Sequence, residues 1–152
     1  MLDNARQAFP ASVQLHQGFG MEFVRGDVLR MPFESAFDLA VCFGALGHIR
    51  TSDGPRFFHE VARTLKPGGR FAFPSANRPS PLSPVGWLAR GFNAAMHVRN
   101  ALIRPPFVMF YLRYLLPEVL DDLRQAGLVP AVSSPFSPPF QEFRLVVATR
   151  PV

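Results

Sequence analysis

The sequence predicts an α/β fold with a parallel sheet, and three consecutive segments carry this prediction. Residues 38–43 are an apolar run without polar alternation, which is typical of a strand covered on both faces by helices. Residues 52–65 follow with apolar side chains at helical spacing, and residues 70–75 then have the pattern of a second strand. A strand, a helix and a strand in this order favour parallel pairing through a right-handed crossover.

The helix over residues 52–65 has recognisable ends and a clear apolar stripe. Ser52 or Asp53 can cap its first turn, where Pro55 is also well tolerated. The Lys-Pro-Gly-Gly turn at 66–69 ends it, because proline cannot continue the ladder and glycine accepts a left-handed cap. The side chains that we expect to be buried are Phe57, Phe58, Val61 and Leu65.

The chain before this unit is expected to hold one helix end and one strand. Residues 1–9 suit the last turns of an amphipathic helix that Pro10 stops, and residues 21–25 are predicted to form a strand. The glycines at 18 and 20 do not indicate a dinucleotide-binding loop, because such a loop follows a strand and opens a helix, whereas this one precedes a strand.

The second half predicts two helices and two further strands. One helix starts at Ser83 and Pro84, with apolar residues at helical spacing as far as Leu102. Another has Pro117 in its first turn, with Leu120 and Leu123 facing inward and Gly127 ending it. Residues 129–133 and 143–149 are the two strand-like runs.

Composition places the chain among single-domain globular proteins. Its 152 residues are enough to bury a core, and the one cysteine, Cys42, excludes an internal disulfide and fits a reducing compartment. We expect Cys42 to be a small core residue rather than a nucleophile. The sequence contains no recognisable signal peptide and no long apolar span, so the expected location is the cytoplasm.

Positive charge is concentrated in the middle of the chain. The net charge is +5, and no acidic residue occurs between Glu60 and Glu118, where eight basic residues lie. Such a field favours an anionic substrate, an acidic lipid surface or nucleic acid. The alternative that we favour is a solvated, arginine-rich face. Nucleic-acid binding ranks last, because the aromatic and basic residues follow helical spacing rather than forming a stacking platform.

Polar and small residues lie just past the ends of the predicted strands. They are Asp27, residues 44–48 and residues 75–77. In an open parallel sheet, ligands bind outside the carboxyl ends of the strands. An aspartate there can accept a hydrogen bond from an exocyclic amine, although strand ends also use aspartate simply to form turns.

Taken together, these residues resemble a known family. "FVRGDVLRMPFESAFDLAVCFGALGHI" and "FFHEVARTLKPGGRFAFPSAN" are similar to the middle of a class I S-adenosylmethionine-dependent methyltransferase of the small-molecule and quinone-biosynthesis type. The tail "LLPEVLDDLRQAGLVP" resembles that family's last helix and sixth strand. The resemblance covers residues 1–76 and 115–149. It implies a Rossmann-like sheet in a single partial domain, 1–152, with 79–115 as a variable helical substrate or lid region.

The resemblance also implies S-adenosylmethionine as the cofactor, and roles for individual residues. In the Gly26-Asp27 pair, Asp27 would accept from the adenine amino group, with the Val28 backbone beside it. Phe43 and Gly44 would pass close to the methionine part of the cofactor. His48 would lie near the transferred methyl group, where some relatives use a histidine as base; the alternative is a polar packing residue. The family's chemistry calls for no metal.

The resemblance further predicts an N-terminally truncated sheet, with the family's first two strands and its Gly-rich turn absent. In the family's strand order, 3-2-1-4-5-7-6, these strands would lie between 21–25 and 38–43. Three explanations compete. The chain starts at an internal methionine; the flanking strands pair directly; or a partner chain, such as a second copy in a homodimer, supplies the strands.

Two functions follow as expectations. The first is methyl transfer to a small or lipophilic molecule, which the truncation would impair. In this function the aromatic side chains of the middle region would form a lid over the substrate; alternatively, they serve ordinary helix packing. The lid residues would be Trp87, Phe92, Phe107, Phe110, Tyr111 and Tyr114. The second is a non-catalytic, methyltransferase-like binding or scaffold fragment. A peripheral membrane contact is a further expected partner, through the basic middle of the chain.

Overall fold

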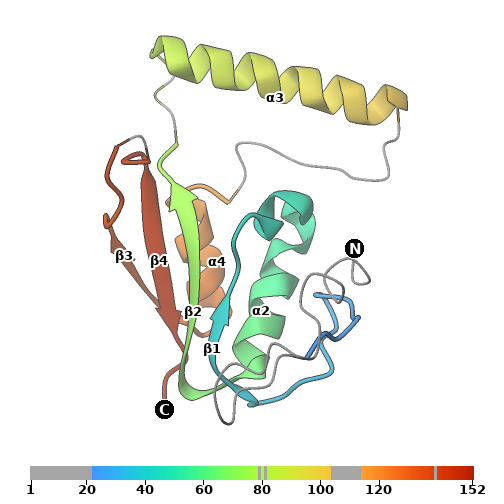
Figure 1. The fold of residues 1–152 in the computed structure, drawn as a ribbon, viewed down its shortest axis with the longest axis vertical. Coiled ribbons are helices and arrows are strands. Elements are labelled where there is room, and N and C mark those ends of the chain that lie inside the picture. The colour runs from blue at the N-terminus through green and yellow to red at the C-terminus, as the bar shows by residue number, and fades with distance from the viewer. Residues whose placement is uncertain (1–21, 79, 81, 104–113, 139) are drawn as a thin grey trace, which may run out of the picture.

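The computed structural model describes residues 22–78, 80, 82–103, 114–138 and 140–152 (Figure 1). Two single-turn 3-10 helices, η1 and η2, follow the first strand. The elements in chain order are β1 (Phe37–Val41), η1 (Ala45–His48), η2 (Thr51–Asp53), α2 (Gly54–Thr64), β2 (Leu65–Ala76), α3 (Pro84–Ile103), α4 (Glu118–Gln125), β3 (Val129–Ser133) and β4 (Phe143–Thr149).

The four strands form one mixed sheet in the order β1-β2-β4-β3. β1 pairs parallel with β2, so that Leu39 lies opposite Arg70 and Val41 opposite Ala72. β4 runs antiparallel to both β2 and β3. The predicted α/β class and the parallel pair joined by a helix are therefore confirmed, and β1 is an edge strand of this sheet.

The core lies between the sheet and the two helices α2 and α4, which cover the same face (Figure 1). Phe58 of α2 is fully buried against Phe71 and Phe73 of β2, with ring centroids 6.3 and 6.1 Å away. Val119 and Leu123 of α4 are fully buried as well. The four residues expected as the buried stripe of α2 are buried as predicted.

The other face of β1 is open, which corrects the expectation of a strand covered on both sides. Leu39 and Val41 are 58% and 59% exposed on the face that points away from α2. The physical reason is that α2 and α4 pack on one face, and the described ranges place no helix over β1 on the other (Figure 1).

The predicted strand at 21–25 is wrong where the structure describes it. Residues 22–26 have no strand pairing, and Val24 is 52% exposed; Met21, like the expected helix at 1–9, lies outside the described residues. A strand needs a partner, and among the described strands β1 pairs only with β2. The direct pairing of the two predicted strands is therefore not seen in this part of the chain.

The ends of the helices follow the predicted turn chemistry with one exception. Ser83 caps α3, because its Oγ accepts a hydrogen bond from the Gly86 amide at 2.9 Å. Gly127 after α4 and Gly68 after α2 adopt φ of +79° and +77°, as left-handed turns require. Asp53 occupies the N-cap position of α2 as expected, but its side chain makes no capping hydrogen bond.

No helix in the described ranges has both the length and the apolarity needed to cross a bilayer. The longest of them, α3, covers most of the described part of the 79–115 region and lies apart from α2 and α4 (Figure 1).

Candidate functional site

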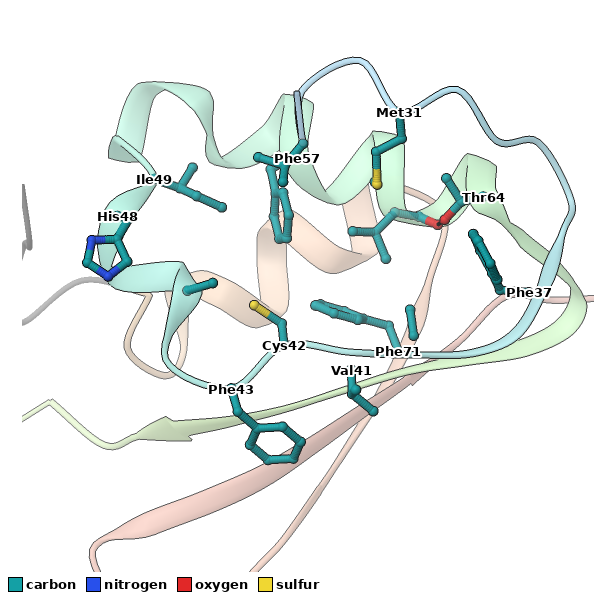
Figure 2. A pocket seen from close by; sticks show the side chains of 14 residues that line it. Met31, Phe37, Val41, Cys42, Phe43, His48, Ile49, Phe57, Thr64 and Phe71 are labelled. Atoms are coloured by element: carbon teal, nitrogen blue, oxygen red, sulfur yellow. Dashed lines mark hydrogen bonds between the residues drawn. The ribbon is translucent and has the colours of Figure 1, made fainter. Parts of the chain in front are cut away.

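A cavity of about 560 Å³ lies between β1, α2 and the loop that contains Val28 and Met31 (Figure 2). Its walls are mostly apolar. The lining residues are Val28, Met31, Phe37, Ala40, Val41, Cys42, Phe43, Ala45, His48, Ile49, Phe57, Val61, Thr64 and Phe71. The volume falls within the range of small-ligand sites, roughly 300–1,000 Å³.

The loop over this cavity is held by hydrogen bonds rather than by a strand partner. The Asp27 carboxylate accepts from the Leu29 amide at 2.9 Å, and the Arg30 amide donates to the Asp27 carbonyl at 3.0 Å. Farther along, the Met31 amide donates to Glu60 Oε2 on α2 at 3.0 Å. Asp27 therefore forms a local turn, which is the structural alternative that the sequence left open.

Three of the predicted site residues meet at this cavity. Val28, Phe43 and His48 all line it, although they come from two separate segments. Gly26 and Asp27 are not among its lining residues, and a Cβ added at Gly26 would meet only Pro32 Cδ, at an ordinary 3.9 Å. Figure 2 adds that the Phe43 ring points to the side of β1 opposite Phe57 and Met31, so Phe43 borders the cavity without filling it.

Gly44 makes the turn from β1 into η1, as its predicted place at the strand end requires. Its φ of +80° belongs to the left-handed region that favours glycine. A Cβ added here would meet no other atom within 4 Å, so open space lies beside the backbone at this point.

A smaller cavity of about 220 Å³ adjoins the first at the carboxyl ends of β1 and β2. Cys42 lines both cavities, and Gly44, Ser75 and Tyr114 line the smaller one. Ser75 Oγ donates to the Tyr114 carbonyl at 2.7 Å, and Tyr114 Oη donates to the Arg50 carbonyl at 2.9 Å. Tyr114 thus joins the end of β2 to the segment after η1.

The described residues contain only part of the expected aromatic lid. Tyr114 is buried in the core and acts as a structural link. Trp87 and Phe92 are exposed on α3, and neither lines either cavity. Phe107, Phe110 and Tyr111 lie outside the described residues.

Burial sets the chemistry of the thiol between the two cavities. Desolvation raises the pKa of Cys42, and hydrogen bonding with the backbone at Ala45 and Leu46 opposes this rise only in part. A raised pKa keeps the thiol protonated near neutral pH, which agrees with a packing residue rather than a nucleophile.

Several cavity residues escaped the sequence analysis as site residues. Phe57 and Val61 were expected only as core side chains of α2, and Met31 carried no signal at all. The helical stripe of α2 could have identified the first two, because a buried stripe beside a strand end is where a pocket wall forms. Met31 joins the site only because its loop folds back over α2.

Comparisons with known proteins relate the chain to methyltransferases. Residues 1–73 match a family described as a methyltransferase domain. The phthiotriol/phenolphthiotriol dimycocerosates methyltransferase of Mycobacterium leprae is 42% identical over 69 residues, which cover 42% of this chain and 25% of that protein. The first half of the chain is therefore homologous to a methyltransferase domain.

Solved structures of methyltransferases are similar to the whole sheet of this chain and not only to its first half. A structure of an S-adenosylmethionine-dependent methyltransferase from Methanosarcina mazei matches 99% of this chain and 76% of its own, with a TM-score of 0.61 and 16% identity. The chain has the class I methyltransferase fold. The 1,6-didemethyltoxoflavin-N1-methyltransferase of Burkholderia thailandensis, solved with 1,6-didemethyltoxoflavin and S-adenosylhomocysteine, matches 86% of this chain and 51% of its own, with a TM-score of 0.57 and 20% identity.

The chain corresponds to only part of the length of its relatives. The chain spans 25% of the length of its M. leprae relative and 43% of a Bordetella parapertussis structure that it also matches. The smaller cavity lies at the carboxyl ends of β1 and β2, where ligands of open α/β sheets bind, and the larger cavity extends along β1 from Phe37 to Phe43.

Proposed function

We propose that the chain is part of an S-adenosylmethionine-dependent methyltransferase whose acceptor is a small or lipophilic molecule. The observation that carries this proposal is the joint position of Val28, Phe43 and His48 on one cavity beside the carboxyl end of β1. The methyltransferase domain match over residues 1–73 supports the same activity.

The described residues fit the adenine end of the proposed cofactor. The cavity is apolar and large enough for a purine ring, and the Val28 backbone borders it. Asp27 lies next to Val28, with its carboxylate exposed and only one hydrogen bond to it described, from Leu29. No carboxylate lines the cavity within the described ranges, so these residues offer no acidic partner for the ribose hydroxyls.

The chain's own part in the reaction would be alignment and exclusion of water. A sulfonium cofactor, when bound, supplies an already activated methyl group, so alignment of the reacting groups does most of the work. The left-handed turn at Gly44 leaves backbone open to a ligand, and the apolar walls formed by Phe57 and Val61 keep water out. In the proposed reaction His48, which lines the larger cavity, would accept the proton from an acceptor hydroxyl.

A lipophilic acceptor is supported by the second cavity. Leu46, Leu115 and Phe143 line it, and it shares the lining residue Cys42 with the first cavity. The relatives named above act on or bind phthiotriol dimycocerosates and 1,6-didemethyltoxoflavin according to their names. For this chain we propose the class of acceptor only.

The second candidate is a non-catalytic binding or scaffold fragment with a methyltransferase fold. The observation in its favour is the missing ribose partner among the described residues. The two candidates differ in one measurable property, because only the first requires the cofactor to bind and its methyl group to be consumed.

Isothermal titration of the purified chain with S-adenosylmethionine and with S-adenosylhomocysteine tests the proposal. We expect saturable binding at concentrations up to about 1 mM. Binding should be weakened in Gly44→Val and unchanged in Leu82→Ala, a control at a 90% exposed residue that lines neither cavity. If neither ligand produced heat, the scaffold alternative would be supported. If the cofactor bound but no labelled methyl group were transferred to any small acceptor, the cofactor site would be supported and the proposed activity contradicted.

A further inference from the structure

Helix α3 directs its large apolar side chains toward solvent. At 3.6 residues per turn, four of them fall within an arc of about 100°. They are Trp87, Leu88, Val98 and Leu102, and they are 67, 76, 58 and 78% exposed. Phe92 and Ile103, which are 48 and 67% exposed, extend this apolar surface by about 60° beyond Leu88. An amphipathic helix on a globular protein normally places such an arc against the core, so the exposed arc of α3 indicates that something else covers it.

The opposite side of α3 is the shielded one, and it is more polar. Ala89, Asn93, Met96 and Asn100 are half-buried and lie within an arc of about 60°. Asn93 Oδ1 and Asn100 Nδ2 are both out of contact with solvent. The orientation of α3 is therefore inverted, with its asparagines turned inward and its apolar arc turned outward.

The charges of α3 are all positive. Arg99 follows Leu88 by about 20° around the helix and so lies within the apolar surface, whereas Arg90 precedes Trp87 by about 60° and lies at its border. Both arginines are exposed. The helix contains no acidic residue, and neither does any other part of the sequence between Glu60 and Glu118.

We propose that α3 lies in the surface of an anionic lipid bilayer, with its apolar arc among the acyl chains and its arginines at the headgroups. A tryptophan beside leucines matches the apolar side of an interfacial helix, and a long arginine side chain such as that of Arg99 can extend from this surface to the headgroups. Each arginine near an anionic surface adds electrostatic attraction. Because α3 does not meet the requirement for a spanning helix, it would lie on the membrane rather than cross it.

A second copy of the chain fits this surface less well. Pairing α3 with its own copy would bring positively charged side chains together, and like charges at an interface oppose association. Anionic headgroups neutralise the same charges. Membrane binding is a separate property from methyl transfer. The test measures lipid binding alone, so a chain without methyltransferase activity could still confirm the membrane proposal.

Trp87 is the only tryptophan of the chain and reports directly on the proposed insertion. The full chain is mixed with vesicles of phosphatidylcholine alone or of phosphatidylcholine with phosphatidylglycerol, and then sedimented. We expect co-sedimentation and a blue shift of Trp87 emission with the anionic vesicles only. Added salt should weaken the binding, because screening reduces attraction to the charged surface.

Two double variants separate the apolar and the electrostatic contributions. Leu88→Gln with Leu102→Gln should weaken binding by roughly tenfold or more, because two apolar side chains no longer enter the acyl region. Arg90→Gln with Arg99→Gln should weaken binding to anionic vesicles by about fivefold or more. Val152→Gln, at a fully exposed apolar residue near the opposite end of the molecule, is the matched control and should bind as the wild type does (Figure 1).

Far-UV circular dichroism of each variant confirms that the fold is retained. The proposal is overturned if the wild type stays in the supernatant with anionic vesicles at low salt, or if the double leucine variant binds as well as the wild type. It is also overturned if sedimentation velocity without lipid shows a dimer that the leucine substitutions dissociate, because a second copy would then be what covers α3.

Discussion

Glu60 and Arg63, one turn apart on α2, form an ion pair that also holds the loop over the larger cavity. Arg63 Nη2 lies 2.8 Å from Glu60 Oε2, and the same carboxylate accepts from the Met31 amide at 3.0 Å. Arg63 donates in turn to the carbonyls of Met31 and Phe33. The pair thus replaces the strand partner that this loop lacks, and the shape of the cavity depends on it.

We expect Glu60→Gln to destabilise the fold by about 1 kcal/mol at neutral pH, with a smaller effect in acid. The hydrogen bond from Arg63 holds the pKa of Glu60 below its ordinary value. A depressed folded-state pKa contributes stability above the unfolded value, and this stability is lost as the pH falls through the folded one. Urea unfolding at about pH 7 and about pH 3.5 measures the difference. Glu142→Gln, an exposed carboxylate elsewhere, is the control, and equal pH dependence in both variants would contradict the prediction.

Phe58→Ala should cost about 3–5 kcal/mol, because Phe58 is fully buried and touches four aromatic rings. This is a large part of the stability of a small domain. Thermal unfolding followed by circular dichroism measures the loss, with Leu82→Ala as an exposed control. A melting temperature close to that of the wild type would show that this aromatic cluster is not the core.

Gly44→Ala should destabilise the chain by about 1–2 kcal/mol through backbone strain alone, since the added Cβ meets no neighbour. Gly44→Asn should cost less, because asparagine tolerates the left-handed region better. Gly91→Ala in α3 also adds a Cβ in open space, but at a helical position, so it should stabilise by about 0.5–1 kcal/mol. Denaturant unfolding of the three variants would contradict this reasoning if both alanine substitutions changed stability in the same direction.

Cys42, the only thiol, should react several-fold more slowly with iodoacetamide in the folded chain than in urea. Partial burial limits access, and the raised pKa lowers the thiolate fraction near neutral pH. The rate should rise steeply above pH 8 and fall when S-adenosylhomocysteine is present, if the cavities beside Cys42 hold it. Equal rates in the folded and unfolded chains would show that Cys42 is freely accessible.

The parts of the fold that local patterns determine could be predicted from the sequence. The apolar stripe of Phe57, Phe58 and Val61 identifies the buried side of α2, and the glycines at 68 and 127 mark turns. The parallel pairing of β1 with β2 follows from the helix between them, because chain connectivity restricts the handedness of the crossover.

The parts that depend on distant partners could not be predicted. Residues 22–26 have strand-like side chains, but a strand forms only where another strand offers hydrogen bonds. The spacing of Leu88, Val98 and Leu102 predicts a helix with an apolar side, yet it does not say whether that side meets the protein. Asp27 taken alone favoured a turn, and only the resemblance to the family predicted a ligand contact; the structure places its carboxylate in a turn.

The edge position of β1 has a consequence for the behaviour of the chain in concentrated solution. Asp38 and a register shift between Phe37 and Leu39 interrupt the start of β1, but Leu39 to Val41 carry no charge or proline that would discourage another chain from adding to the strand. The unpaired edge of β1 can therefore pair with a strand of another molecule and start aggregation. A lysine introduced at Val41, which is already 59% exposed, would place a positive charge beside this edge, and we expect it to reduce aggregation.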